Sequence, residues 1–116
     1  MSAPPFWKAL EEHGRWQRAN LPGIDTRQGS ALLVWLLRND GQPRPIGQLY
    51  KESSRSSEPT MRDCVKAFVE HGLAFVERDP SDSRIRLLRG TPKLRQVVQE
   101  YRQRIGQLAE SRSSSC

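Results

Sequence analysis

The chain has 116 residues, a formal net charge of +6 and a pI near 10.0, and this length fits a single domain with one modest core. Its two cysteines are too few for a disulfide-stapled secreted protein, and no apolar run approaches the length of a membrane span. We therefore expect a cytoplasmic protein without membrane contact. The positive charge favours a polyanionic partner, because Lys and Arg that bind phosphates release condensed counterions.

The first predicted elements are two helices separated by a break. Phe6, Trp7, Leu10 and Trp16 supply the apolar residues of a helix over residues 6–19, although their spacing fits a single stripe only loosely. The run Leu21-Pro-Gly-Ile-Asp interrupts this pattern, since proline lacks an N–H and glycine favours turns. Residues 29–39 are then apolar on nearly every side, which predicts a central helix surrounded by its neighbours.

The middle of the chain predicts a helix-turn-helix. Asp40-Gly-Gln-Pro-Arg-Pro stops the central helix, and residues 46–52 form a short helix with Pro45 at its first position. A polar turn over residues 53–57 follows, and Ser57 is an effective N-cap for an amphipathic helix that ends at Gly72. Its apolar face carries Met61, Cys64, Val65, Phe68 and Val69. Its polar face carries Thr60, Arg62, Asp63 and Lys66.

The last third of the chain predicts a hairpin and a helix. Residues 73–78 and 85–89 are rich in strand formers and flank the polar run Asp79-Pro-Ser-Asp-Ser-Arg. Thr91 and Pro92 are an N-cap and a first helical residue. The helix that follows has one apolar stripe, formed by Leu94, Val97, Val98, Tyr101, Ile105 and Leu108. Residues 111–116 are expected to be a disordered tail.

This order of elements is that of a winged helix-turn-helix. We therefore predict a mainly α fold with a small two- or three-stranded β wing. Residues 1–25 would be the N-terminal helix and linker, residues 26–91 the winged domain, and residues 92–110 the C-terminal helix. In such a fold the helix over residues 57–71 enters the major groove of double-stranded DNA, and the wing over residues 79–84 enters the minor groove.

Nine residues are candidate DNA contacts. Thr60 and Arg62 lie where a major-groove helix meets base edges, whereas the polar residues before the helix are placed to meet phosphates. Arg84 at the hairpin tip is suited to the narrow minor groove, and Asp82 can hold the loop. The complete set is Arg55, Ser56, Ser57, Thr60, Arg62, Lys66, Asp82, Arg84 and Arg86.

The stretch from Glu70 to Leu88 resembles the recognition-helix end and wing of MarR-type transcriptional regulators, whose motif runs Gly-Leu, then Arg, then Asp-Pro-x-Asp-x-Arg. A looser resemblance runs from about Ser30 to Tyr101, and Pro59-Thr60-Met61 matches the opening of the family's recognition helix. The resemblance implies wing roles for Asp82 and Arg84. It also implies recognition-helix contacts by Ser57, Thr60 and Arg62.

Three departures from the family pattern bear on DNA sequence preference and on the geometry of the turn. Asp63 stands where the family often has a basic residue. The turn at residues 53–57 lacks the usual apolar plug and is one residue longer. Arg89-Gly-Thr-Pro replaces the common entry to the following helix.

The resemblance further implies a repressor that acts as a homodimer joined through its terminal helices. The apolar residues of segments 6–16 and 94–108 could form the dimer interface. Two DNA half-sites about 34 Å apart would then each receive one recognition helix. The alternative is that the final stripe packs on the N-terminal helix of the same chain. A small-molecule effector is compatible with this function, and no cofactor is expected.

Other function classes find less support. His13 and His71 are far apart and beside no nucleophile, so we expect no enzyme, and two cysteines with two histidines in this arrangement do not predict a metal site. Cys64 on an apolar face indicates a core thiol more than a redox switch. The main rival is a winged-helix interaction module or antagonist that no longer binds DNA, which Asp63 and the irregular turn favour. Salt-dependent duplex binding separates the two.

Overall fold

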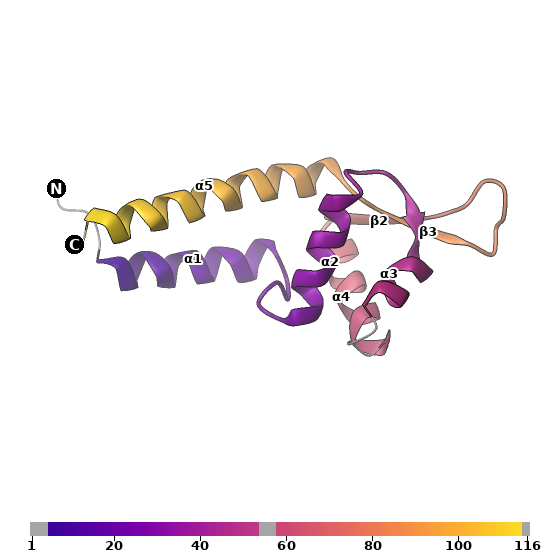
Figure 1. Ribbon diagram of the computed structural model, residues 1–116, viewed down its shortest axis with the longest axis horizontal. Coiled ribbons are helices and arrows are strands. Elements are labelled where there is room, and N and C mark those ends of the chain that lie inside the picture. The colour runs from indigo at the N-terminus through magenta and orange to yellow at the C-terminus, as the bar shows by residue number, and fades with distance from the viewer. Residues whose placement is uncertain (1–4, 54–57, 115–116) are drawn as a thin grey trace.

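The computed structural model describes residues 5–53 and 58–114, with side chains up to Glu110. Within these residues, five helices and three strands follow in the order α1 (Phe6–Asn20), α2 (Arg27–Arg38), β1 (Arg44–Pro45), α3 (Ile46–Glu52), α4 (Glu58–Glu70), β2 (Ala74–Arg78), β3 (Arg86–Gly90) and α5 (Pro92–Ser114). The predicted winged helix-turn-helix is confirmed. The molecule measures 59 × 27 × 21 Å. The free ends of α1 and α5 lie at one end and the β2–β3 hairpin lies at the other (Figure 1).

The core lies where α2, α4, the sheet and the start of α5 meet. Leu32, Phe68 and Leu88 have no exposed surface, and each comes from a different one of these elements. Met61, Val65 and Phe68 share the buried face of α4, as their spacing predicted. Val69 is 38% exposed and therefore lies at the edge of that face.

The central helix is buried on one side and exposed on the other. The hydroxyl of Thr26 caps α2 by accepting the Gly29 N–H at 3.1 Å, and Leu32, Leu33, Trp35 and Leu36 are buried. Val34 and Leu37, however, are 50% and 43% exposed. The expectation that α2 is surrounded by its neighbours was therefore wrong, because helical geometry turns these two positions away from the core.

A Schellman motif ends α4 and fixes the direction of the wing. Gly72 has φ of 73°, the left-handed conformation that glycine adopts most readily. Its N–H donates to the Val69 carbonyl at 3.0 Å, and the Leu73 N–H donates to the Phe68 carbonyl at 2.9 Å. His71 Nδ1 also donates to the Ala67 carbonyl at 3.0 Å, so the His71 side chain caps the end of this helix.

The strands form one antiparallel sheet in the order β1-β3-β2, so the wing has three strands. Val76 pairs with Leu88 and Ala74 pairs with Gly90 on the face toward the core. On the outer face, Arg89 pairs with Phe75 and lies 4.8 Å from the centroid of its ring. Pro45 is the N-cap residue of α3 rather than its first helical residue.

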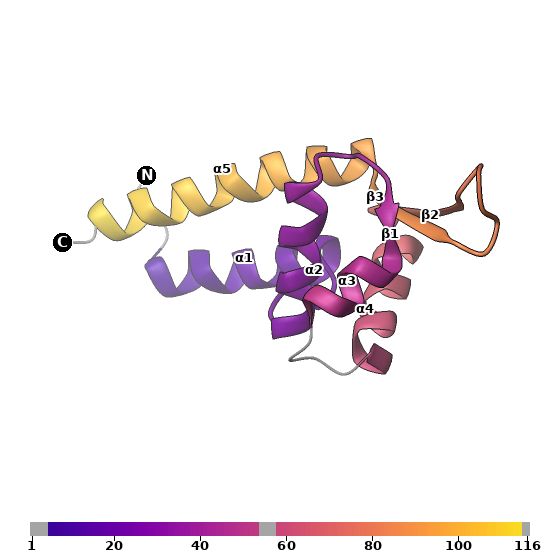
Figure 2. The same cartoon turned by 45° about the vertical axis from the view of Figure 1, so that its right-hand side comes forward.

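The α1–α5 pair extends away from the winged region, and the two helices run side by side in both views (Figures 1 and 2). The Leu94 N–H donates to Thr91 Oγ1 at 3.3 Å, which confirms the predicted N-cap of α5. The helix continues to Ser114, four residues into the segment expected to be a disordered tail, while residues 115–116 lie outside the described part. Ile105 belongs to the predicted apolar stripe but is 45% exposed.

Candidate nucleic-acid interface

Helix α4, which the sequence predicts to be the recognition helix, presents a polar side to solvent. Thr60, Arg62, Asp63 and Lys66 are all exposed, whereas Met61, Val65 and Phe68 are buried beneath them. The predicted division of the helix into a buried and an exposed face is therefore confirmed. Arg55, Ser56 and Ser57, three of the nine candidate contacts, lie outside the described residues.

Three of the candidate contacts converge on one groove between α3, α4 and the sheet. Arg62 and Lys66 reach it from α4, and Arg86 reaches it from β3 at the base of the wing. The groove has a volume of about 680 Å³. Apolar side chains, among them Val65 and Val76, also line it. The fold thus brings together cations that are distant in the sequence, since Lys66 and Arg86 are 20 positions apart.

Arg62 is held by two neighbours within this groove. Its Nη2 donates to Glu58 Oε1 at 2.8 Å, one helical turn away on α4. Its Cζ lies 5.6 Å from the centroid of the Tyr50 ring on α3, within the range of a cation–π contact. The hydrogen bond to Glu58 raises the pKa of the Arg62 guanidinium. Burial raises the pKa of the Tyr50 hydroxyl, and the nearby charges of Arg62 and Arg86 oppose that shift.

The tip of the wing is organised by two aspartates. Asp82 Oδ1 accepts the Arg84 backbone N–H and its Nε, each at 3.1 Å, and Asp82 Oδ2 accepts Nη2 at 3.2 Å. These hydrogen bonds lower the pKa of Asp82. Asp79 accepts the Ser81 N–H and hydroxyl at 2.8 and 2.7 Å, which lowers the pKa of Asp79. Asp82 therefore holds the loop as expected, and the Arg84 side chain remains 88% exposed.

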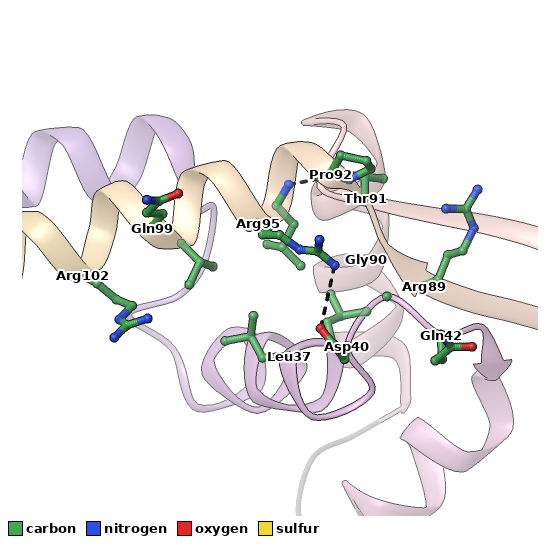
Figure 3. Close-up of a pocket in the computed structure, with 14 residues that line it drawn as sticks. Leu37, Asp40, Gln42, Arg89, Gly90, Thr91, Pro92, Arg95, Gln99 and Arg102 are labelled. Atoms are coloured by element: carbon green, nitrogen blue, oxygen red, sulfur yellow. Dashed lines mark hydrogen bonds and ion pairs between the residues drawn. The ribbon is translucent and has the colours of Figure 1, made fainter.

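A second concavity lies on another part of the molecule, between the end of α2, the loop after it and the start of α5 (Figure 3). Its volume is about 540 Å³, and Arg89, Arg95 and Arg102 are among its lining residues. Arg95 Nη2 lies 3.8 Å from Asp40 Oδ1 across the opening. The sequence did not predict this site, because its residues come from segments that only the fold brings together.

Sequence reasoning also missed Tyr50 and Glu58 as neighbours of Arg62. The i, i+4 spacing of Glu58 and Arg62 is a recognisable signal for an ion pair on a helix. No comparable signal marks Tyr50, since its contact with Arg62 depends on how α3 packs against α4.

A metal site, a membrane span and a reactive cysteine would each require specific features of the described part of the chain. Among those residues, no group of three or more metal-ligating side chains comes together, and no helix is long and apolar enough to cross a membrane. Cys64 is partly buried as a free thiol. Burial, followed by the charge of Asp63, raises its pKa and so disfavours the reactive thiolate.

Comparisons with known proteins place the fold among transcriptional regulators. No family model matches the chain, and no curated protein matches it. Among solved structures, the chain is similar to a mutant of S. aureus MepR bound to an oligodeoxyribonucleotide, with a TM-score of 0.65, 16% identity, and coverage of 96% of this chain and 80% of that one.

Two further solved structures are similar over most of their length. MarR gives a TM-score of 0.59 at 17% identity, with coverage of 90% of this chain and 74% of that one. BpsR of Bordetella bronchiseptica, whose DNA binding is regulated by 6-hydroxynicotinic acid, gives 0.53 at 22% identity, with coverage of 90% and 78%. The chain therefore has the winged-helix fold of MarR-type regulators.

Proposed function

We propose that this chain is a sequence-specific, double-stranded DNA-binding transcriptional regulator of the MarR type, acting as a repressor. The helix over residues 57–71 enters the major groove, and the wing over residues 79–84 enters the minor groove. The observation that carries this proposal is the groove in which Arg62 and Lys66 of α4 meet Arg86 of the wing.

The physical reason is the match between this surface and duplex DNA. A major groove about 12 Å wide accepts one helix whose inner side packs on its own protein core. Cations on the outer side of α4 and on the wing face the phosphate strand that separates the major from the minor groove. The hairpin loop between β2 and β3 extends past α3 and α4 (Figures 1 and 2), and the side chain of Arg84 in this loop is 88% exposed.

A duplex-binding titration at several salt concentrations tests the proposal. The affinity of the wild-type protein for DNA should fall steeply as salt rises, in proportion to the phosphates contacted. Arg84→Ala should weaken binding, and it should leave the melting temperature unchanged because the side chain is 88% exposed. Arg18→Ala on α1 removes the same charge from an exposed position away from the wing and serves as the control. An affinity for duplex DNA that changes neither with salt concentration nor in the Arg84→Ala variant would contradict the proposal.

A second candidate is an interaction module or antagonist that no longer binds DNA. Two acidic residues on the exposed side of α4 favour it, since Glu58 already pairs with Arg62 at 2.8 Å and Asp63 is exposed where DNA would approach. This candidate predicts no salt-dependent duplex binding in the titration described above.

We also propose that the protein is a homodimer joined through α1 and α5. In one chain α1 and α5 already pack together through Trp16 and Tyr101, whose ring centroids lie 6.2 Å apart. That contact nevertheless leaves Trp7, Leu10 and Ile105 exposed by 65%, 49% and 45%, and a second copy would cover such residues. Sedimentation of wild type and Ile105→Asp should give dimer and monomer masses, respectively; a monomeric wild type would contradict the proposed dimer.

The cavity between α2 and α5 is our candidate site for a small-molecule effector. Its lining has three arginines and one carboxylate, that of Asp40, and this excess of positive charge favours an anionic ligand. BpsR, which has a similar fold, is regulated by a small aromatic acid. Arg95→Ala should lower the affinity for 6-hydroxynicotinic acid, used as a probe in calorimetry, without altering DNA binding in its absence. Equal affinities of wild type and variant would remove this cavity as the site.

A further inference from the structure

Tyr50 belongs to α3, the first helix of the helix-turn-helix, yet its ring lies beside the side chain of Arg62 on the recognition helix. The distance from Arg62 Cζ to the ring centroid is 5.6 Å. Both residues line the groove that Lys66 and Arg86 also line, and α3 crosses beside α4 in Figure 2. Tyr50 therefore connects the two helices at the site where the proposed DNA contacts converge.

The three cations of the groove differ in their surroundings. Arg62 has a carboxylate oxygen at 2.8 Å, whereas among the described residues neither Lys66 nor Arg86 has a carboxylate within 4.0 Å. A phosphate gains less attraction from a guanidinium whose charge is already balanced than from an unbalanced one. Lys66 and Arg86 are therefore the better general phosphate contacts.

Arg62 is instead suited to recognise a base. A guanidinium presents five N–H donors in a rigid fork, and the hydrogen bond to Glu58 uses a donor on Nη2, so other donors remain for a partner. An arginine can donate two parallel hydrogen bonds to guanine O6 and N7 in the major groove. A long side chain that is held before binding loses less rotamer freedom when the complex forms.

We propose that Tyr50 and Glu58 are positioning residues that hold Arg62 in the orientation for a base edge, and thereby set the DNA sequence preference of this protein. Glu58 anchors one end of the guanidinium, and the Tyr50 ring supports it from α3. The inference rests on the proposed function, and it adds that sequence preference depends on a residue outside the recognition helix. Bulk affinity for DNA depends instead on Lys66 and Arg86, whose charges no carboxylate of the described residues balances.

The experiment begins with selection of a preferred duplex from a random pool by the wild-type protein. The measured quantity is then the ratio of affinities for that duplex and for a scrambled duplex of the same composition. Tyr50→Leu should lower this ratio about tenfold, while its affinity for the scrambled duplex and its salt dependence stay at wild-type values. Tyr50→Phe keeps the ring and should keep the ratio.

Glu58→Gln tests the second anchor. Loss of the carboxylate leaves Arg62 uncompensated, so binding to the scrambled duplex should become stronger and more salt-dependent, and the ratio should fall. Phe75→Leu is the matched control for Tyr50→Leu. The Phe75 ring also lies beside an arginine, with 4.8 Å from its centroid to Arg89 Cζ, but on the outer face of the sheet. That variant should keep the wild-type ratio.

A double-mutant cycle separates positioning from a merely structural role of Tyr50. Arg62→Lys keeps the charge and loses the planar fork, so it should lower the ratio with Tyr50 intact. In that background Tyr50→Leu should have no further effect, because both act through the same guanidinium. If the melting temperature shows that Tyr50→Leu is poorly folded, Glu58→Gln decides the matter, since Glu58 is exposed and its substitution leaves the core intact.

The remaining outcomes separate failure of the positioning role from failure of the proposed DNA-binding function. An unchanged ratio in Tyr50→Leu, or independent effects of Tyr50→Leu and Arg62→Lys, would overturn the positioning role and leave the proposed DNA-binding function intact. A wild-type protein that enriches no duplex from the pool would overturn the proposed function itself.

Discussion

The winged region and the α1–α5 pair are held together in different ways. The winged region has a continuous apolar core in which Leu32, Phe68 and Leu88 have no exposed surface. The helix pair instead depends on a stack of His13, Trp16 and Tyr101, with ring centroids 5.6–6.3 Å apart, and none of the residues of α1 is buried. The helix pair therefore exposes apolar side chains that a second copy of the chain would cover. The exposed side of α4 is polar instead.

The difference teaches where this small protein obtains its stability and where it presents its functional surfaces. A core that excludes water on all sides fixes the relative orientation of α4 and the wing, which the proposed DNA recognition requires. A half-exposed helix pair tolerates rearrangement, and such regions open at lower free-energy cost than the core. The following predictions test this contrast, from the largest expected effect to the smallest.

Phe68→Ala should be the most damaging substitution, because Phe68 is fully buried in the winged core. Loss of a buried phenyl ring leaves a cavity, and we expect the free energy of unfolding to fall by about 3–5 kcal/mol. Chemical denaturation measures this change. Val69→Ala, at the next position and 38% exposed, is the control and should cost far less; equal effects would mean that the buried face of α4 is misassigned.

Gly29→Ala should disturb the junction between the two regions. A Cβ at this position would collide with the backbone carbonyl of Gly23 in the turn after α1, and backbone atoms cannot move aside as a flexible side chain can. We expect a loss of roughly 2–3 kcal/mol in the free energy of unfolding. Gly47→Ala is the control, since its added Cβ would meet nothing within 4 Å. A stable Gly29→Ala protein would show that the turn adapts.

Trp16→Ala should affect the helix pair selectively. Trp16 stacks with His13 and Tyr101, and Arg104 Cζ lies 4.8 Å from the centroid of its ring. Removal should cost about 1–2 kcal/mol and should speed amide hydrogen exchange in α1 more than in α4. Trp16→Phe keeps a ring and should restore most of the protection. Uniform acceleration in both helices would mean that the two regions unfold as one unit.

The thiol of Cys64 should give the smallest effect, one of reactivity rather than stability. Its pKa is raised by burial and by Asp63, so at neutral pH it should react with iodoacetamide more slowly than a free cysteine does, measured in a Cys116→Ser variant. Because a raised pKa reduces the thiolate fraction, the rate should still be rising with pH above the ordinary value for a thiol. A rate equal to that of free cysteine would reopen the redox-switch interpretation.

Much of the winged region was predictable from local patterns. Met61, Val65 and Phe68 recur at helical spacing, Gly72 follows the last helical turn, and Asp79-Pro-Ser-Asp-Ser-Arg separates two strand-like runs; each pattern acts within a few residues. Three candidate contacts, Arg62, Lys66 and Arg86, were predicted from the same patterns, and their contact with DNA remains a prediction. Arg55, Ser56 and Ser57 lie outside the described residues.

The expectations that were wrong concern relations across the chain. The apolar run of α2 suggested burial on every side, yet Val34 and Leu37 are about half exposed, because burial depends on which neighbours the helix receives. The polar composition after Glu110 suggested a tail, yet α5 continues to Ser114, as an established helix adds further turns at little cost.

The sequence alone determined the succession of helices and the β2–β3 hairpin, because caps, turns and apolar periodicity are set by residues close together in the chain. Strand β1 lies in the run expected to be a turn and forms only by pairing with β3. The tertiary structure alone decided that Tyr50 lies beside Arg62, that Arg86 joins Lys66 in one groove, and that three arginines surround a cavity at α5. Such contacts depend on how separate elements pack. That packing minimises the summed energy of many weak interactions over the whole core, and no local sequence pattern contains this sum.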